Sequence, residues 1–247
     1  MQEEDDDGGY TVSTFRTDLN RGSATCGALV ALASLLVLPT AAVARGHHHK
    51  PPKPPASQAG KFDYYVLSLS WSPEHCAEKP GGPDDSQCGV GRHYAFVVHG
   101  LWPQYDNGGY PQTCSTANRL SDDVVQRTLD IMPSEDLIRH EWQKHGTCSG
   151  LPADEYFEHA RQAFQRVTIP DQYKGPGTAF HVTATMVRDE FRAANASLPA
   201  DGIFVLCNGH FLAELRICVS KDALAARACG RKVGDKCNGE VTVRPLR

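Results

Sequence analysis

The chain has 247 residues and a formal net charge of −4 when its histidines are counted as neutral. This near balance excludes a protein that holds nucleic acid mainly through a large basic excess. All 11 histidines follow residue 44, and the chain beyond that residue holds 23 acidic and 23 basic residues. We therefore expect this part to become cationic toward pH of about 5 and to bind polyanions better there.

The N-terminal region has the features of an export signal. An apolar run, Cys26–Pro39, is followed by Ala42-Val43-Ala44, a small-x-small pattern typical of signal-peptide cleavage. The run is short for a membrane-spanning helix, so a signal anchor is the weaker alternative. The acidic lead-in, residues 1–10, is unusual for a signal peptide and suggests an over-long start. We expect residues 1–44 to be a signal peptide and the mature protein to be periplasmic or extracellular.

A linker and one folded domain are predicted to follow. Residues 45–60 contain His47-His48-His49 and four prolines, a composition that cannot bury an apolar core and is typical of an extended linker. Residues 61–247 are then long enough for a single domain with a substantial core. We expect this domain to be a monomer without stable membrane association.

Eight cysteines remain once Cys26 in the leader is set aside: Cys76, Cys88, Cys114, Cys148, Cys207, Cys218, Cys229 and Cys237. An even number behind a signal peptide predicts four disulfides formed in an oxidising compartment. Eight cysteines can pair in 105 ways, so counting leaves the connectivity open. The chain has no Cys-x-x-Cys pair, which makes a zinc site the weaker alternative.

The pattern of apolar residues predicts an α+β domain with a central, mainly antiparallel sheet packed against several helices. The segment 76–92 is rich in Gly, Pro and Asp and is predicted to be a loop. Asn208-Gly209 between two apolar runs predicts a hairpin. Strands are expected at 64–71, 93–101, 203–207, 210–219 and 240–243, and helices at 121–131, 134–145, 153–166 and 178–194.

The predicted helix 134–145 carries the densest group of reactive side chains. Ser134 is its expected N-cap and Gly146 its expected stop. Glu141 lies three residues before Lys144 and four before His145, so the three side chains share one helix face. His140 and His145 are five residues apart, about 140° around the helix, which is poor geometry for chelating one metal. This face therefore suits proton transfer and anion stabilisation.

A second group lies at the end of the predicted strand 93–101, where His99 is followed by Gly100-Leu101-Trp102-Pro103. Two histidines with an ordinary pKa of about 6.5 can act as general base and general acid around a phosphodiester. Trp102 offers a ring face on which a base can stack. Because the sequence shows no acidic cluster for Mg²⁺, the nucleophile would come from the substrate. The 2′-hydroxyl of RNA meets this need, and DNA has none.

Two segments carry a resemblance to a known family. Phe96–Pro103 and His140–Cys148 resemble the two signature segments of the ribonuclease T2 family, and similarity extends to Leu69–Pro73 and Leu206–Asn208. The resemblance implies an α+β fold and cleavage of single-stranded RNA through a 2′,3′-cyclic phosphate, without metal or other cofactor. DNA should not be cleaved.

The resemblance also implies roles for particular residues. His145 would be the base that activates the 2′-hydroxyl, and His99 the acid that protonates the 5′-oxygen, an assignment that the residues alone leave open. The remaining implied roles are phosphate polarisation by Glu141 and Lys144, phosphate contact by His140, and base stacking by Trp102 and Tyr110. The implied disulfides are Cys76–Cys88, Cys114–Cys148, Cys207–Cys237 and Cys218–Cys229, which gives Cys148 a structural role.

Two other functions compete with a ribonuclease. The first is a binding protein on the same fold without catalytic activity, which would not need a matched pair of histidines. The second is a metal-dependent hydrolase that uses His140, His145 and the 47–49 tract, which the spacing disfavours. Chelation with EDTA separates these alternatives.

Overall fold

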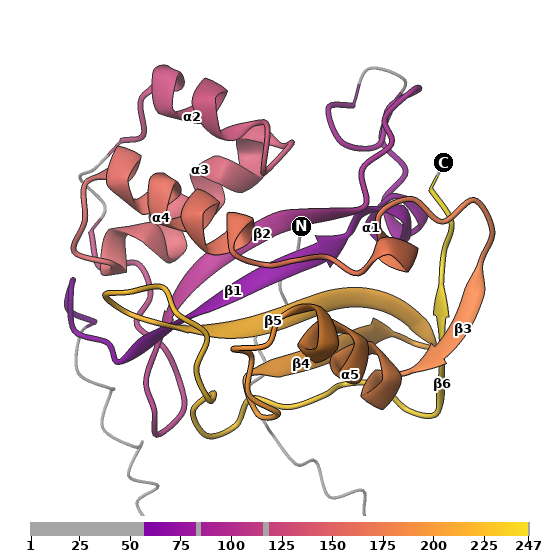
Figure 1. The fold of residues 1–247 in the computed structure, drawn as a ribbon. Coiled ribbons are helices and arrows are strands. Elements are labelled where there is room, and N and C mark those ends of the chain that lie inside the picture. Colours follow the sequence, from indigo (N-terminus) through magenta and orange to yellow (C-terminus); the bar gives the residue numbers. More distant parts are fainter. Residues whose placement is uncertain (1–56, 83–84, 116–118, 247) are drawn as a thin grey trace, which may run out of the picture. The chain divides into compact units, whose positions relative to one another are not determined.

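The computed structural model describes residues 57–82, 85–115 and 119–246; the predicted signal peptide and most of the predicted linker lie outside these residues. In the described chain, three consecutive helices follow the first two strands, and three consecutive strands end the domain (Figure 1). The strands are β1 (Tyr64–Trp71), β2 (Phe96–Gln104), β3 (Phe180–Thr183), β4 (Ile203–Asn208), β5 (Phe211–Ser220) and β6 (Glu240–Val243). The helices are α1 (Ser72–Glu78), α2 (Asp122–Thr128), α3 (Glu135–Lys144), α4 (Ala153–Gln165) and α5 (Ala184–Ala194), with 3-10 turns at Gly146–Cys148 and Asp171–Tyr173.

Within the described residues, six strands form one sheet in the order β2-β1-β5-β6-β3, with β4 also paired to β5. The pairs β1–β2, β1–β5, β4–β5 and β3–β6 are antiparallel, and β5 meets β6 in parallel at Phe211 and Thr242. Helices α2, α3 and α4 gather beside β1 and β2, while α5 lies along β4 (Figure 1). The α+β class and the mainly antiparallel sheet are confirmed.

Most predicted elements form, and three need correction. The second strand begins later than predicted, at Phe96. The predicted loop 76–92 starts with the end of α1, a short helix that Pro73 opens in its first turn. The predicted helix 178–194 is wrong at its start, because 180–183 is strand β3 paired with β6. There Val182 is buried against β6, and the Thr183 hydroxyl caps α5 by accepting a hydrogen bond from the Met186 N–H.

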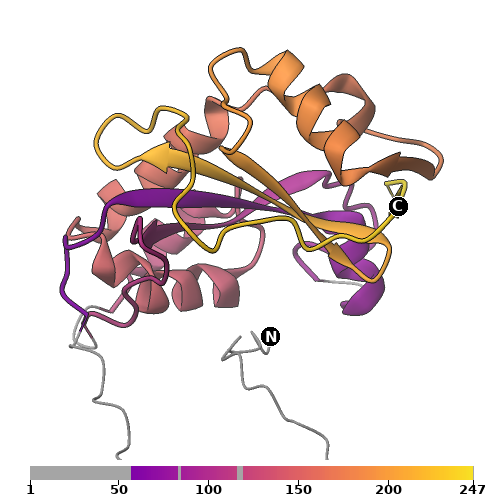
Figure 2. The same cartoon turned by 90° about the horizontal axis from the view of Figure 1, so that it is seen from below.

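The sheet packs on both faces, because successive residues of a strand point to opposite sides. On β1, Leu67, Leu69 and Trp71 belong to the large core that the helices cover. The alternate residues Tyr64 and Val66 lie in a smaller buried cluster with Trp102 and Cys218. Figure 2 shows the strands twisting across the molecule with α5 to one side of them.

Covalent and polar contacts fix the edges of this domain. The four disulfides named above are formed: Cys76–Cys88, Cys114–Cys148, Cys207–Cys237 and Cys218–Cys229. The end of the predicted linker is attached to the domain, since the Gly60 N–H donates to the Cys148 carbonyl at 2.9 Å. The Lys221 ammonium donates to the Gly60 carbonyl at 2.8 Å.

Candidate active site

A β-bulge in β2 directs His99 toward the smaller cluster. Val98 pairs with Leu69 of β1 and Gly100 pairs with Ser68, so His99 is an extra residue between them. Val98 and Leu101 are both fully buried in the large core. In an unbroken strand these two residues would lie on opposite faces. The bulge therefore leaves His99 and Gly100 together on the other face, and bulges of this kind re-aim side chains at active sites.

His99 lies among groups from three elements. Its Nδ1 is 3.2 Å from Oε2 of Glu214 on β5, and its Nε2 is 3.8 Å from Oε1 of Glu141 on α3. Its ring meets the Trp102 ring edge to face, with centroids 5.3 Å apart. The His99 side chain is 15% exposed, so it is not sealed from solvent.

Helix α3 holds Glu141 against β2. The helix begins as predicted, because the Ser134 hydroxyl accepts a hydrogen bond from the Leu137 N–H at 3.3 Å. Glu141 is fully buried, and its Oε2 accepts a hydrogen bond of 2.7 Å from the Trp102 indole. A Cβ on Gly100 would lie 2.1 Å from the same oxygen, so the glycine of this motif makes room for the bond between indole and carboxylate.

His145 follows the last residue of α3 and is 3% exposed. Its ring centroid lies 5.4 Å from that of Trp102 and 5.6 Å from that of Tyr110. The loop with Tyr110 is fastened to the end of α3 by the Cys114–Cys148 disulfide and by a hydrogen bond of 2.8 Å from the Thr113 N–H to the Lys144 carbonyl. The imidazoles of His99 and His145 come from distant parts of the sequence, and both contact the Trp102 ring.

The other predicted site residues differ in how far their side chains are exposed to solvent. Lys144 is half-buried and His140 is exposed, and both lie on α3 just before His145. Tyr110 is 40% exposed, whereas Trp102 is 6% exposed. Trp102 therefore has little open ring area, and its clearest contacts are with its protein neighbours.

Sequence reasoning missed Glu214 and Arg216. Both project from β5 onto the face of His99, and Arg216 Nε lies 2.6 Å from Glu214 Oε1. The Arg216 guanidinium also stands 5.0 Å from the Trp102 ring centroid. Burial raises the pKa of Glu214, but Arg216 and His99 outweigh it and lower that pKa to about 2. A signal was present in the sequence, namely two opposite charges at alternate positions of a strand that is otherwise largely apolar.

His75 on α1 is a further neighbour that the sequence did not single out. Burial lowers its pKa, and the positive charges of Lys79 and His99 lower it further. The imidazole of His75 is thus electrostatically coupled to His99 and is held toward its neutral form.

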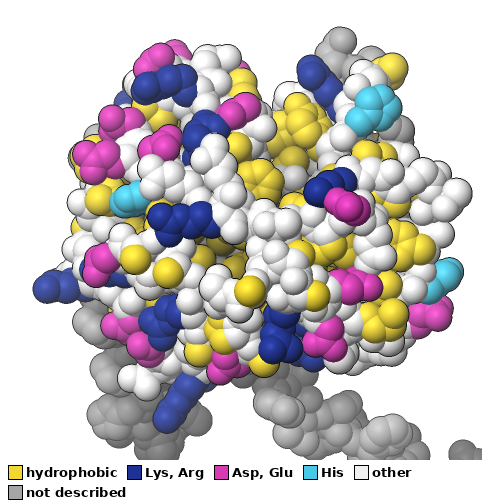
Figure 3. Space-filling view, viewed as in Figure 1, with side chains coloured by type: hydrophobic (Ala, Val, Ile, Leu, Met, Phe, Trp, Pro, Cys, Tyr) yellow, Lys and Arg dark blue, Asp and Glu magenta, His cyan; other side chains and the backbone are white. Residues whose placement is uncertain are grey.

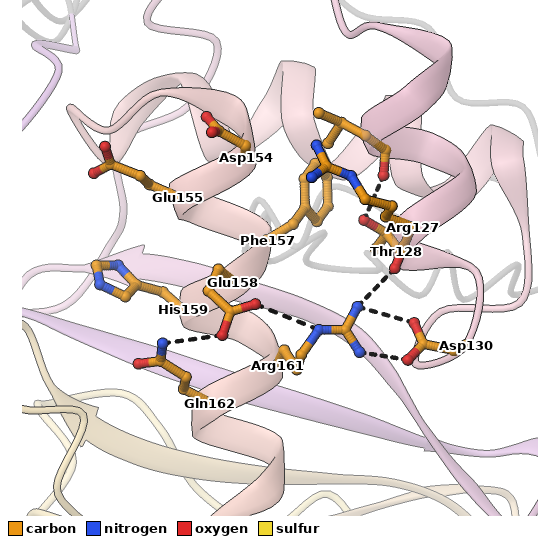
Figure 4. A pocket seen from close by; sticks show the side chains of 11 residues that line it. Arg127, Thr128, Asp130, Asp154, Glu155, Phe157, Glu158, His159, Arg161 and Gln162 are labelled. Atoms are coloured by element: carbon orange, nitrogen blue, oxygen red, sulfur yellow. Dashed lines mark hydrogen bonds and ion pairs between the residues drawn. The ribbon is translucent and has the colours of Figure 1, made fainter.

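A separate groove of about 640 Å³ lies between α2 and α4 (Figure 4). Its lining includes none of the predicted site residues. Its central cation is already bound within the protein: Arg161 pairs with Asp130 and Glu158 and donates to the Arg127 carbonyl at 2.7 Å. This groove is therefore distinct from the place where the imidazoles meet.

The surface charges are mixed. On the face drawn in Figure 3, Lys and Arg side chains are interspersed with Asp and Glu. Among residues 57–82, 85–115 and 119–246, no three His, Cys, Asp or Glu side chains converge on a common metal position. Of the helices in this part of the chain, none has the length and apolar content needed to span a membrane.

The fold and the site define an α+β, disulfide-bonded protein with two imidazoles and a buried carboxylate around one indole. A sequence model of the Ribonuclease T2 family matches residues 62–229. The chain belongs to the ribonuclease T2 family, and its activity is that of an RNA endonuclease.

Relatives in sequence and structure agree with this placement. A ribonuclease of Aeromonas hydrophila is 38% identical over 187 residues, which cover 70% of this chain and 78% of the relative. Ribonuclease DdI of Dictyostelium discoideum is 26% identical over 212 residues, covering 75% and 86%. Among solved structures, an RNase-related protein from Calystegia sepium aligns with a TM-score of 0.61 at 21% identity, over 75% of this chain and 98% of its own. Ribonuclease MC1 from bitter gourd seeds aligns with a TM-score of 0.58 at 21% identity, over 73% and 99%. These structural likenesses show the fold.

Proposed function

We propose that this enzyme cleaves single-stranded RNA by attack of a 2′-hydroxyl on the adjacent phosphorus, using His99 and His145 as an acid–base pair. The products are a 2′,3′-cyclic phosphate and then a 3′-phosphate. One observation carries the proposal: both imidazoles contact the Trp102 ring, whose indole also holds the buried Glu141 carboxylate. Two titratable rings in one small site match the need to remove one proton and supply another.

In the first step, His145 accepts the 2′-hydroxyl proton while the bond from the 2′-oxygen to phosphorus forms. His99 donates its proton to the 5′-oxygen as the bond between phosphorus and that oxygen breaks. In the second step, His99 takes a proton from water, which attacks the cyclic phosphate. His145 returns a proton to the 2′-oxygen as it leaves, so both rings regain their starting states.

The charged residues of α3 act on the phosphate. Lys144 offers an ammonium to the oxygens that gain negative charge in the transition state. Glu141 is fixed by the Trp102 indole at 2.7 Å, so its carboxyl group has a defined direction. His140 is exposed and contributes a phosphate contact rather than a proton transfer.

Base binding falls mainly to Tyr110. Its ring is 40% exposed beside His145, and an exposed aromatic ring is a platform for a nucleobase. Trp102, at 6% exposure, adds a contact at the ring edge and chiefly positions Glu141.

The enzyme works without a metal or other cofactor and does not cleave DNA, because the nucleophile is the 2′-hydroxyl of the substrate. It is exported to the periplasm or the medium as a monomer without stable membrane association. The four disulfides support an oxidising compartment.

Digestion of dinucleoside phosphates in EDTA tests the reaction. Phosphorus NMR should show a 2′,3′-cyclic phosphate that precedes the 3′-phosphate, and a 2′-deoxy substrate should stay intact. Loss of activity in EDTA would point to a metal-dependent hydrolase. Binding of RNA without any cleavage would point to a binding protein on the same fold.

A further inference from the structure

We propose that Glu214 is the positioning residue of His99: it fixes which ring nitrogen carries the proton and favours the charged imidazolium. The inference deepens the proposed function and rests on it. The carboxylate Oε2 lies 3.2 Å from His99 Nδ1, and both side chains are largely buried, at 12% and 15% exposure. The contact joins β5 to β2 across β1, since Glu214 pairs with Ser70 and the bulge places His99 on the same face.

Glu214 is held more firmly than a surface carboxylate. Its strand β5 is paired on both sides, with Ser70 of β1 and Leu206 of β4 opposite Glu214. Its second oxygen, Oε1, lies 2.6 Å from Arg216 Nε. A carboxylate with one oxygen bound to a guanidinium presents the other in a fixed direction. This geometry suits a group that orients its neighbour.

The ionisation of Glu214 decides the tautomer of His99. The pKa of Glu214 is lowered to about 2, so the group is a carboxylate throughout the pH range in which an imidazole titrates. A carboxylate can only accept a hydrogen bond, so His99 Nδ1 must carry the hydrogen between them. Nε2 is then the nitrogen that exchanges protons with the substrate, and it lies on the side of Glu141, 3.8 Å from Oε1.

Charged neighbours of His99 include groups on α1, α3 and β5. Glu141 and Glu214 favour the imidazolium, whereas Arg216 and the coupled His75 oppose it. Glu214 is the nearer of the two carboxylates, at 3.2 Å against 3.8 Å. Loss of its charge should therefore make His99 release its proton at lower pH.

The test is Glu214→Gln, which keeps the shape and removes the charge, followed by NMR titration of the His99 ring without RNA. The midpoint should fall by about one pH unit. In the rate profile, the limb that belongs to His99 should fall by the same amount, with KM for a dinucleoside phosphate little changed. If His99 is the acid, the alkaline limb moves, and kcat above it falls about tenfold.

Two further variants keep the proposal open to refutation. Arg216→Met removes the opposing charge, so the His99 midpoint should rise. Glu240→Gln is the matched control, because Glu240 Oε1 lies 3.3 Å from Nδ1 of the exposed His181, away from the site. An unchanged His99 midpoint in Glu214→Gln, equal to that of the control, would overturn the proposal even if the enzyme cleaves RNA as proposed. A shifted midpoint in a protein that cuts no RNA would instead leave the positioning contact standing and remove the proposed function.

Discussion

The two faces of the central strands differ, because one packs into the large core and the other carries the polar groups of the candidate site. On β1, Leu67 and Ser68 are adjacent and both fully buried, yet Leu67 points into the large core and Ser68 toward the site. On β5, Leu215 faces the core while Glu214 faces His99. Close packing on one face fixes the strands, and the fixed strands hold polar groups of the other face at constant separations. Stability and chemistry should therefore be largely separable in this domain.

The bulge at His99 is where the two faces are most closely linked. It keeps both Val98 and Leu101 in the core while it turns His99 to the site. In a regular strand Val98 and Leu101 would lie on opposite faces, so one of the two would leave the core. Substitutions on the site face should therefore mainly reduce catalysis, and those on the core face should mainly reduce stability.

The largest effect is expected at the site face. His99→Ala should lower kcat/KM by about 10²–10⁴-fold, because it removes an acid–base group, while thermal unfolding changes little. Cleavage of a dinucleoside phosphate and a melting curve measure both. His181→Ala is the matched control, since that imidazole is exposed and pairs with Glu240. Near-normal turnover in the His99 variant would contradict the proposed mechanism.

A substitution in the large core is expected to give the opposite result, a loss of stability with little loss of activity. Leu67→Ala should lower the free energy of unfolding by about 2–5 kcal/mol, because the truncated side chain leaves a cavity in a fully buried position. Activity per folded molecule should stay close to that of the unmodified enzyme. Urea unfolding and turnover at low temperature provide the two readouts.

Ser68→Ala is the matched test of the neighbouring residue. The Ser68 hydroxyl is buried and has no hydrogen-bond partner among the described residues. Its removal should change the free energy of unfolding by less than about 1 kcal/mol, or raise it, because an unsatisfied buried hydroxyl is costly. A loss as large as that of the Leu67 variant would show that the two faces are not separable.

Much of this arrangement was predictable from the sequence. The pattern of apolar residues predicted β1 and β6, and Asn208-Gly209 between two apolar runs predicted the β4–β5 hairpin. Ser134 was correctly expected to cap α3. The segment 180–183 was assigned to a helix because it runs into one, and only its pairing with β6 makes it a strand. Local sequence cannot reveal such distant pairing.

Residues of the candidate site could be grouped from the sequence where they stand close together in the chain. His99 and Trp102 share one motif, and Glu141, Lys144 and His145 share another. Glu214 could not be assigned, because its contact with His99 depends on the register of β1 with both β2 and β5 and on one bulge. Nothing near Glu214 in the chain specifies that register.

The charge of Glu214, on the site face, makes stability depend on pH. Glu214 has a pKa of about 2 in the folded state against an ordinary value of 4.5, so it stabilises the fold above pH 4.5. That contribution is lost as pH falls from 4.5 through about 2, and amounts to about 3 kcal/mol. Urea unfolding over this range should show a steeper loss in the unmodified protein than in Glu214→Gln. Parallel curves would mean that the carboxylate, although close to His99, adds no stability through its charge.

At Gly100, stability and catalysis are expected to change together. An added Cβ would lie 2.1 Å from Glu141 Oε2 and 2.2 Å from Trp102 Nε1, so the bond between them must lengthen or break. Gly100→Ala should lower the free energy of unfolding by about 1–3 kcal/mol, the usual range for overpacking. It should also reduce kcat, because Glu141 loses its fixed direction.

The control for Gly100 is Gly177→Ala, where a Cβ would meet nothing within 4 Å. That variant should match the unmodified protein in activity and differ by less than about 1 kcal/mol in stability. If Gly100→Ala lost stability but kept kcat, the indole–carboxylate bond would belong to the packing of α3 against β2. If it lost kcat as well, the same bond would be part of the catalytic geometry, and the motif glycine would be needed on both faces.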